Sequence, residues 1–345
     1  MKKALVLGLL ASLFFAVTFV LNRQMQVGGG HWIWSSSLRF YYMAPLLFIL
    51  MLPGKRYMTV LREIRKNAAA WFLWSTVGFG IFYLCLTMAA SYGPSWLIAS
   101  TWQVTIIAGA LLTPLFYRKS NNANSDRNSD RNSDRNSDRN SDRNSDRNSE
   151  SPVRVRHALP VKQLVVSAFI LTGIVLVQIQ DAVAVPDDTA LAGMVLVLVA
   201  AFAYPLGNRK MMAVVSSGLG TMERVFGMTL CSLPFWLLLS AAGLVMGVRP
   251  TAGQFVQTLV VAVFSGIIAT FLFFKATELV RDEVRELAAV ESTQAGEVVF
   301  ALFGGALVFK DALPSPVALF GIAVIVAGIF LNAMLTRKGP AQGLQ

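Results

Sequence analysis

Carboxyl and amide side chains are rare inside the long apolar stretches of this 345-residue chain, and three of them gather within residues 287–308. Glu291, Gln294 and Glu297 recur at every third position there, so at about 100° per residue they share one polar third of an α-helix. An ionised side chain at the centre of a membrane helix costs about 2.5–3.5 kcal/mol, and each one needs a partner, water or a function. Glu297 lies near the middle of the stretch, which predicts a carboxylate that couples transport to proton exchange. Glu291 lies nearer one end, where we expect more hydration.

Two cations also fall inside apolar stretches, Arg39 within residues 32–52 and Lys275 within residues 255–277. Either cation could form a static ion pair with Glu297, which is the alternative to a coupling role for that carboxylate. Arg39 is further a candidate for binding an anionic group of a solute, or for positioning a glutamate.

Polar and aromatic groups in two more apolar stretches could contact a solute. Trp102 offers a π face to an organic cation, and Gln103 can exchange hydrogen bonds with a neutral solute. Packing is the alternative role for Trp102. Together with Tyr83, these residues complete the candidate coupling or substrate-binding set: Glu297, Glu291, Gln294, Lys275, Arg39, Gln103, Trp102 and Tyr83.

The elements that position these groups are predicted to be transmembrane helices. The chain is 55% hydrophobic and only 14% charged, whereas a soluble domain carries about a quarter charged residues. Apolar stretches of spanning length recur along it, and in lipid such segments must satisfy their backbone internally as helices. We expect an all-α integral membrane protein of ten helices near residues 4–21, 32–52, 68–90, 95–117, 162–180, 190–207, 222–247, 255–277, 287–308 and 316–335.

Other site classes find little support in the sequence. Cys85 and Cys231 stand alone in separate apolar stretches, and the two histidines, His31 and His157, lie in expected loops. Neither a phosphate-binding G-x-x-x-x-G-K-[ST] loop nor a hydrolase or zinc-protease motif occurs. The net charge of +11 is not arranged as a basic patch interleaved with aromatics. We therefore expect no cofactor, no metal, no nucleic-acid partner and no enzyme activity.

The distribution of cations predicts the orientation. Of the 30 Lys and Arg residues, 25 fall on one side of the expected helices and 3 on the other, with Arg39 and Lys275 inside them. The positive-inside rule then places both termini in the cytoplasm. Trp32, Trp34, Trp71 and Trp74 lie near expected helix starts and are typical of interfacial aromatic belts.

Residues 118–161 form the longest expected loop, on the cytoplasmic side. Asn124 to Arg147 is six perfect Asn-Ser-Asp-Arg repeats without an apolar residue. Such a run cannot bury a core, and we expect a disordered linker. Binding of phosphate or RNA by its arginines is the less favoured alternative.

An internal repeat divides the chain into two halves. Asn22-Arg23-Gln24-Met25 matches Asn208-Arg209-Lys210-Met211, Arg39 matches Arg224, and Gly80-Ile81 matches Gly266-Ile267. Ser100-Thr101-Trp102-Gln103 matches Glu291-Ser292-Thr293-Gln294, so the four offsets are 186, 185, 186 and 191. Because five helices separate the matched positions, the halves run through the membrane in opposite senses. We expect residues 1–117 with 162–180, and residues 186–336, to be two inverted five-helix repeats.

Three runs carry a resemblance to a known family: Thr101-Trp102-Gln103-Val104-Thr105 leading to Thr113-Pro114, Arg224 to Pro234, and Val290 to Phe300. They resemble the drug/metabolite transporter superfamily and, within it, the bacterial ten-helix family of multidrug resistance efflux transporters. Apart from the Asn-Ser-Asp-Arg repeats, nearly the whole chain takes part. The resemblance implies an exporter of the cytoplasmic membrane, coupled to a proton or other ion gradient. The small four-helix exporters of the superfamily carry a coupling glutamate in their first helix, and residues 4–21 contain no acid, so coupling here must use another site.

The leading hypothesis is a secondary active transporter that exports small amphipathic solutes. A flippase for a lipid-linked intermediate and a lipid-modifying enzyme are the alternatives. Besides the solute, membrane lipid is an expected partner. The Gly243-x-x-x-Gly247 spacing favours close helix packing, within one chain or between two copies in a homodimer.

Overall fold

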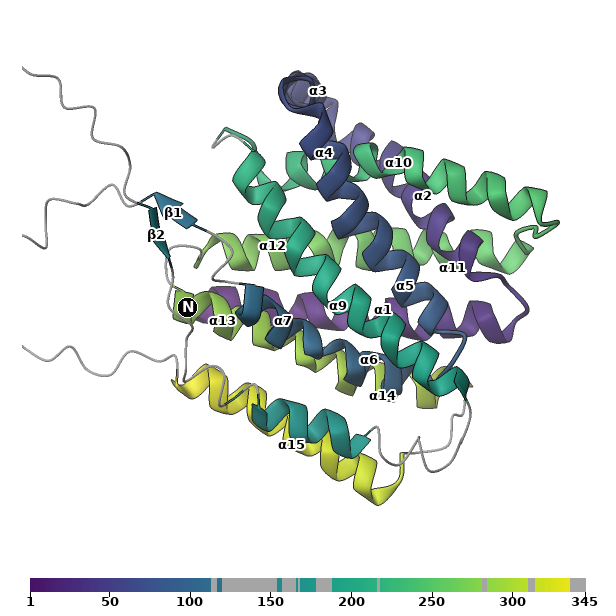
Figure 1. The fold of residues 1–345 in the computed structure, drawn as a ribbon, viewed down its shortest axis with the longest axis vertical. Helices are drawn as coiled ribbons and strands as arrows, with labels where there is room; N and C mark the ends of the chain where they lie inside the picture. Colours follow the sequence, from purple (N-terminus) through teal and green to yellow (C-terminus); the bar gives the residue numbers. More distant parts are fainter. Residues whose placement is uncertain are drawn as a thin grey trace, which may run out of the picture. The chain divides into compact units, whose positions relative to one another are not determined.

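The computed structural model describes residues 1–112, 117–119, 154–156, 166, 168–177, 188–215, 218–280, 284–309 and 314–335. Residues 1–110 and 160–345 form one compact unit, and residues 111–159 form a second. The first unit is helical throughout its described elements (Figure 1). The second contains the end of one helix and two three-residue strands.

The long apolar runs of the first half form helices that are not regular α-helices along their whole length. A π-helical segment, η2, interrupts one run, and a single residue, Gln103, separates two helices of another. The elements are α1 (Lys2–Val27), α2 (Trp32–Met51), η1 (Pro53–Lys55), α3 (Arg56–Lys66), α4 (Ala68–Ser75), η2 (Thr76–Ile81), α5 (Phe82–Ala89), α6 (Ser95–Trp102) and α7 (Val104–Leu112).

The second half follows the same plan. Its third helical run again contains a π-helical segment, η4, and its fourth is interrupted by a 3₁₀ turn, η5. A helical segment at Ala168–Val177 precedes α9 (Asp188–Val214), α10 (Thr221–Val245), α11 (Ala252–Val261), η4 (Ala262–Ala269), α12 (Thr270–Glu278), α13 (Val284–Ser292), η5 (Thr293–Ala295), α14 (Gly296–Phe309) and α15 (Pro316–Leu335).

Five continuous helical runs in the described part of the chain are long and apolar enough to cross a bilayer. They are Lys2–Val27, Ala68–Ala89, Leu191–Val214, Thr221–Val245 and Ala252–Glu278. A sixth is reached if Trp32–Met51 and Pro53–Lys66, which meet at a bend of 101°, count as one. Ten spans therefore stay a prediction, while the helical membrane class is confirmed.

The core of the first unit is centred on three helices that pack against partners distant in sequence. α1 packs along α12, η4 and α14, α9 packs along α5 and η2, and α10 packs along α2 (Figure 1). Small residues permit the closest approach: a Cβ built on Gly207 of α9 would lie 2.3 Å from the Cα of Gly78 in η2. Glycine at both positions lets the two backbones touch.

Several expected boundaries were wrong. α9 continues to Val214, beyond the expected end at residue 207, so Arg209 and Lys210 lie in a helix. Long cationic side chains are tolerated near the end of a membrane helix because they can extend away from the apolar surface. The expected helix over 95–117 does not reach Tyr117, which begins β1 (Tyr117–Lys119). This strand pairs antiparallel with β2 (Arg154–Arg156), so the expected 118–161 loop contains ordered pairing at its ends. The Asn-Ser-Asp-Arg repeats lie outside the described residues.

Two smaller interpretations also change. α10 ends at Val245, and Gly247 follows with a φ of 76° and no atom within 4 Å of a built Cβ, so it ends the helix and does not pack it. Only Gly243 makes a close helix contact, with Ile33 of the same chain. Trp71 is fully buried, so it does not belong to an interfacial belt. A Cβ on Gly227 of α10 would meet its ring at 2.5 Å.

Candidate functional site

A cavity that is partly open lies among helices of both halves. About 540 Å³ in it is free of atoms, a figure that includes solvent at its mouth, and only about 40 Å³ lies far enough from the walls to hold the centre of a water molecule. That is room for a few water molecules or part of a small solute. Its lining is mainly aromatic and aliphatic with a few polar groups: Phe15, Thr18, Phe19, Arg39, Phe40, Met43, Phe79, Phe82, Leu86, Trp102, Tyr204, Ser265, Thr270, Gln294 and Glu297.

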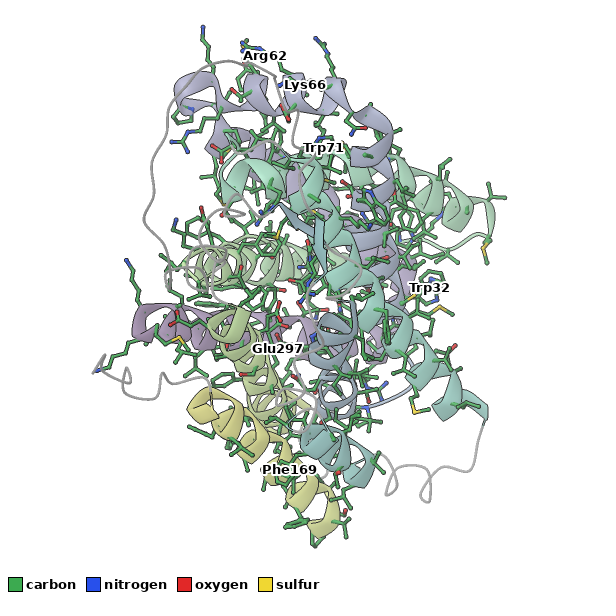
Figure 2. The ribbon with its side chains drawn as sticks, turned by 60° about the vertical axis from the view of Figure 1, so that its left-hand side comes forward. Trp32, Arg62, Lys66, Trp71, Phe169 and Glu297 are labelled. Atoms are coloured by element: carbon green, nitrogen blue, oxygen red, sulfur yellow. The ribbon has the colours of Figure 1, made fainter. Side chains whose placement is uncertain are left out.

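Glu297 lies in the first turn of α14, directly after the helix break at η5. Its side chain is only 1% exposed and lines the cavity. Figure 2 labels Glu297 among the side chains of the helices. Within the described residues, neither Arg39 nor Lys275 forms an ion pair with it. Glu297 is therefore a buried acid without an ion-pair partner among the described residues, placed where 3₁₀ winding returns to α-helical winding.

Arg39 reaches the same cavity from α2. Its Nη2 donates to Ser265 Oγ at 3.3 Å, and its guanidinium lies over the Tyr83 ring, 4.0 Å from the centroid. Tyr83 does not line the cavity and is held in turn by Asn22, whose Nδ2 donates to the phenol oxygen at 3.3 Å. The Nε of Arg39 has no hydrogen-bond partner in the described part of the chain. One buried donor is therefore available to a ligand or water.

Gln103 and Gln294 mark the two helix breaks and lie against each other. Gln103 Nε2 donates to Ala99 O at 3.0 Å and reaches Gln294 O at 3.5 Å. Only Gln294 is among the residues that line the cavity. Next to the first break, the Trp102 ring lies 5.2 Å from that of Phe82 and 5.7 Å from that of Tyr204, whose rings are 4.8 Å apart, and the three form an aromatic wall of the cavity.

Glu291 and Lys275 lie elsewhere. Glu291 Oε1 pairs with Arg209 Nη2 at 3.4 Å, with both side chains partly exposed. Lys275 Nζ pairs with Glu278 at 3.1 Å, and Thr221 donates to the same carboxylate oxygen at 3.0 Å. The helix expected over 287–308 is interrupted by the 3₁₀ turn η5, and Glu291, six residues before Glu297, does not line the cavity. The two glutamates do not share one site.

Four polar residues of the cavity were missed from the sequence: Thr18, Tyr204, Ser265 and Thr270. Thr18 hydrogen-bonds to Ser265, and Thr270 Oγ1 donates to Ser265 O at 3.1 Å, five residues back in the π-helical region. Hydroxyl side chains commonly bond to their own helix, so their presence in an apolar run gives no signal. Tyr204 precedes Pro205 in α9, and this proline was the one available signal of a departure from regular packing there.

Equivalent irregularities occur in both halves. The π-helical segments begin at Thr76 and Ala262, which are 186 residues apart. Arg39 lies over Tyr83 of α5, and Arg224 lies over Phe274 of α12, 4.8 Å from the centroid. These offsets agree with those of the repeated sequence motifs. Helix breaks and π-helical turns are frequent at functional sites, and here they surround the cavity.

In the described part of the chain, no group of three or more His, Cys, Asp or Glu side chains is placed to hold a metal ion. The polar groups available in the cavity are one carboxyl, one guanidinium, an amide and several hydroxyls. Such a set can bind a solute or exchange a proton.

Comparison with protein families gives one match over nearly the whole chain. The model of the family described as "Putative multidrug resistance efflux transporter" (EmrE) matches residues 2–137 and 143–338.

Individual proteins match over similar lengths. "Uncharacterized protein YjlA" of Bacillus subtilis (strain 168) is 46% identical over 335 residues, which cover 97% of this chain and 95% of that protein. "Uncharacterized 42.1 kDa protein in intracellular alkaline protease 3'region" of Shouchella clausii is 41% identical over 295 residues, or 86% and 70% of the two chains. A solved structure described as "Crystal structure of protein" aligns over 98% of both chains with a TM-score of 0.61 at 12% identity, which shows the fold alone.

Proposed function

Since the chain belongs to the family of EmrE-like multidrug resistance efflux transporters, a family of multi-pass membrane proteins, we propose that it exports small amphipathic solutes by secondary active transport coupled to protons. The observation that carries this proposal is the Glu297 carboxyl, 1% exposed, in a cavity between helices of both halves.

The proposed coupling rests on one carboxyl group serving two ligands. A carboxylate that is buried beside a cavity, without an ion-pair partner among the described residues, can accept a proton or face a cationic solute, but not both at once. Efflux then follows from exchange of the proton for the solute at Glu297.

The solute class follows from the lining. Phe40, Phe82 and Trp102 provide aromatic faces, while Glu297 and the Arg39 guanidinium provide charge. A solute with an apolar or aromatic body and a polar or cationic end would satisfy both parts.

We further propose ten spans in two inverted repeats, in the cytoplasmic membrane, with both termini in the cytoplasm. The matched offsets of the π-helical segments and the stacked arginines support the repeat. The cation bias supports the orientation. Cysteine labelling tests it: in a cysteine-free background, Ser133→Cys should resist membrane-impermeant maleimide in intact cells, and strong labelling from outside would reverse the topology.

Glu297→Gln in proteoliposomes tests the function. The amide keeps the shape of the side chain but cannot titrate, so solute flux driven by an imposed pH gradient should be abolished. Ethidium and other fluorescent organic cations serve as the transported probes. Glu286→Gln on α13 is the matched control, because Glu286 does not line the cavity. If Glu297→Gln retains the full response to the gradient, Glu297 is structural and the coupling assignment fails.

A further inference from the structure

α3 is a short helix that departs sharply from the direction of the long helices. It follows α2 across a bend of 101°, which occurs at Gly54, with a φ of 70°, and at Lys55, with a φ of 53°. In Figure 1 it is seen nearly end-on at the edge of the first unit, whereas α1 and α15 run across the view. If α2 crosses the bilayer, α3 lies close to the membrane plane at the end of that span.

The inner face of α3 packs against α10. Val60 is fully buried and Ile64 nearly so, and Val60 packs beside Gly227 of α10. Its one acid, Glu63, faces inward at 9% exposure and pairs with Lys66 at 2.8 Å. Arg56 pairs with Glu223 of α10 at 3.4 Å. The helix is therefore anchored, and its only negative charge is occupied.

The outer face combines cations with apolar side chains. At about 100° per residue, Met58, Leu61, Arg62 and Arg65 fall within an arc of about 100° opposite the buried residues. Met58 is 39% exposed and Leu61 is 37% exposed, and both arginines are exposed. No acid in the described residues forms an ion pair with Arg62 or Arg65. Figure 2 shows Arg62 and Lys66 extending away from the bundle.

This arrangement differs from what orientation alone requires. The positive-inside rule is met by cations anywhere in a short loop, including a flexible one. Here the cations are ordered on one arc of a helix and interleaved with exposed apolar groups. Helices of this kind lie at the boundary between headgroups and acyl chains, with aliphatic groups dipping inward and guanidinium groups at the phosphates.

We propose that α3 binds anionic phospholipid, with Arg62 and Arg65 contacting the lipid phosphate and Met58 and Leu61 contacting the upper acyl chain. The ligand is the phospholipid of the leaflet at that end of the bundle. Arginine suits the phosphate because its planar group can donate two parallel hydrogen bonds. The site is separate from the cavity of the proposed transport function and does not depend on it.

Native mass spectrometry of the full chain tests the proposal, with phosphatidylglycerol and phosphatidylcholine added as competing lipids. The wild-type protein should retain phosphatidylglycerol in preference. Arg62→Gln with Arg65→Gln should weaken phosphatidylglycerol binding about 20- to 30-fold, since each cation near an anionic surface contributes about 1 kcal/mol, a factor of about five. Lys2→Gln with Lys3→Gln is the matched control, because it removes the same charge from exposed positions of α1.

Two further variants separate the parts of the site. Arg62→Lys with Arg65→Lys should restore much of the preference, because the charge remains. Leu61→Ser with Met58→Ser should reduce retention of both lipids, because the acyl contact is lost. Equal retention of the two lipids by the wild-type protein would overturn the proposal. So would an Arg62→Gln/Arg65→Gln variant that keeps its preference, or a Lys2→Gln/Lys3→Gln control that loses it equally.

Discussion

The side-chain amide of Gln103 completes the helix break that its own backbone creates. Its backbone N–H donates to Ser100 O at 3.1 Å, one residue short of the α-helical acceptor Ala99. Its Nε2 then donates to Ala99 O at 3.0 Å and reaches Gln294 O, at the break of the other half, at 3.5 Å. One side chain thus donates to carbonyls at two helix breaks in an apolar interior.

Gln103→Leu should destabilise the protein by about 1–2 kcal/mol, because it leaves both carbonyls without this donor in a buried site. Denaturant unfolding in mixed micelles measures the effect. Thr172→Val is the control: its Oγ1 donates only to Ala168 O of its own exposed turn, so its loss should cost far less. Equal effects of the two substitutions would show that the contact between the breaks contributes nothing.

The contact of α9 with η2 leaves no space for a side chain. Gly207→Ala would place its Cβ 2.3 Å from the Cα of Gly78, so the two helices must separate, and we expect a loss of about 1–3 kcal/mol or more in unfolding free energy. Gly253→Ala in α11 is the matched substitution in open space and should be neutral or stabilising by up to about 1 kcal/mol. Thermal unfolding of the purified variants in detergent ranks them. Similar melting temperatures for the two would contradict the close approach.

The sequence predicts the membrane class, the family and most helix positions well, because long apolar runs permit few other structures. Glu297 and Arg39 stand out from it for the same reason: charge in such a run is costly. A hydropathy pattern does not indicate where an α-helix changes to π-helical or 3₁₀ winding, so the π-helical segments and the 3₁₀ turn at Thr293–Ala295 were not predicted.

The amphipathic helix α3 was missed for a different reason. Its five neighbouring cations, from Lys55 to Lys66, indicate a cytoplasmic loop, and the short period of Tyr57, Val60 and Ile64 is easily overlooked beside them. Thr18 and Ser265 could not be assigned to the cavity at all, because only the packing of α1 against η4 brings them together.

Glu291→Gln should leave transport driven by a pH gradient largely intact. The Glu291 carboxylate is 26% exposed and pairs with Arg209 outside the cavity, where a partly solvated pair contributes at most about 1 kcal/mol. Arg209 also keeps its bond to Gly109 O at 2.6 Å. Proteoliposome flux of the same organic cation compares Glu291→Gln with Glu297→Gln. Complete loss of coupling in Glu291→Gln would move the coupling role to that residue.

The stacking of Arg39 on Tyr83 should stabilise the cavity wall by an energy that requires both side chains. A double-mutant cycle of Arg39→Gln and Tyr83→Leu, measured by denaturant unfolding in mixed micelles, is expected to give a coupling of about 1–2 kcal/mol. This is the range of a desolvated cation–π contact, which the 4.0 Å separation and the burial of both residues favour.

Tyr83→Phe separates the ring from its hydroxyl. It removes the hydrogen bond with Asn22 but keeps the aromatic face, so a cycle of Arg39→Gln with Tyr83→Phe should show little coupling. Arg39→Lys keeps the charge while losing the planar group over the ring and should recover only part of the stability. If the Tyr83→Phe cycle gave as much coupling as the Tyr83→Leu cycle, the interaction would pass through the hydroxyl and Asn22 and not through the ring.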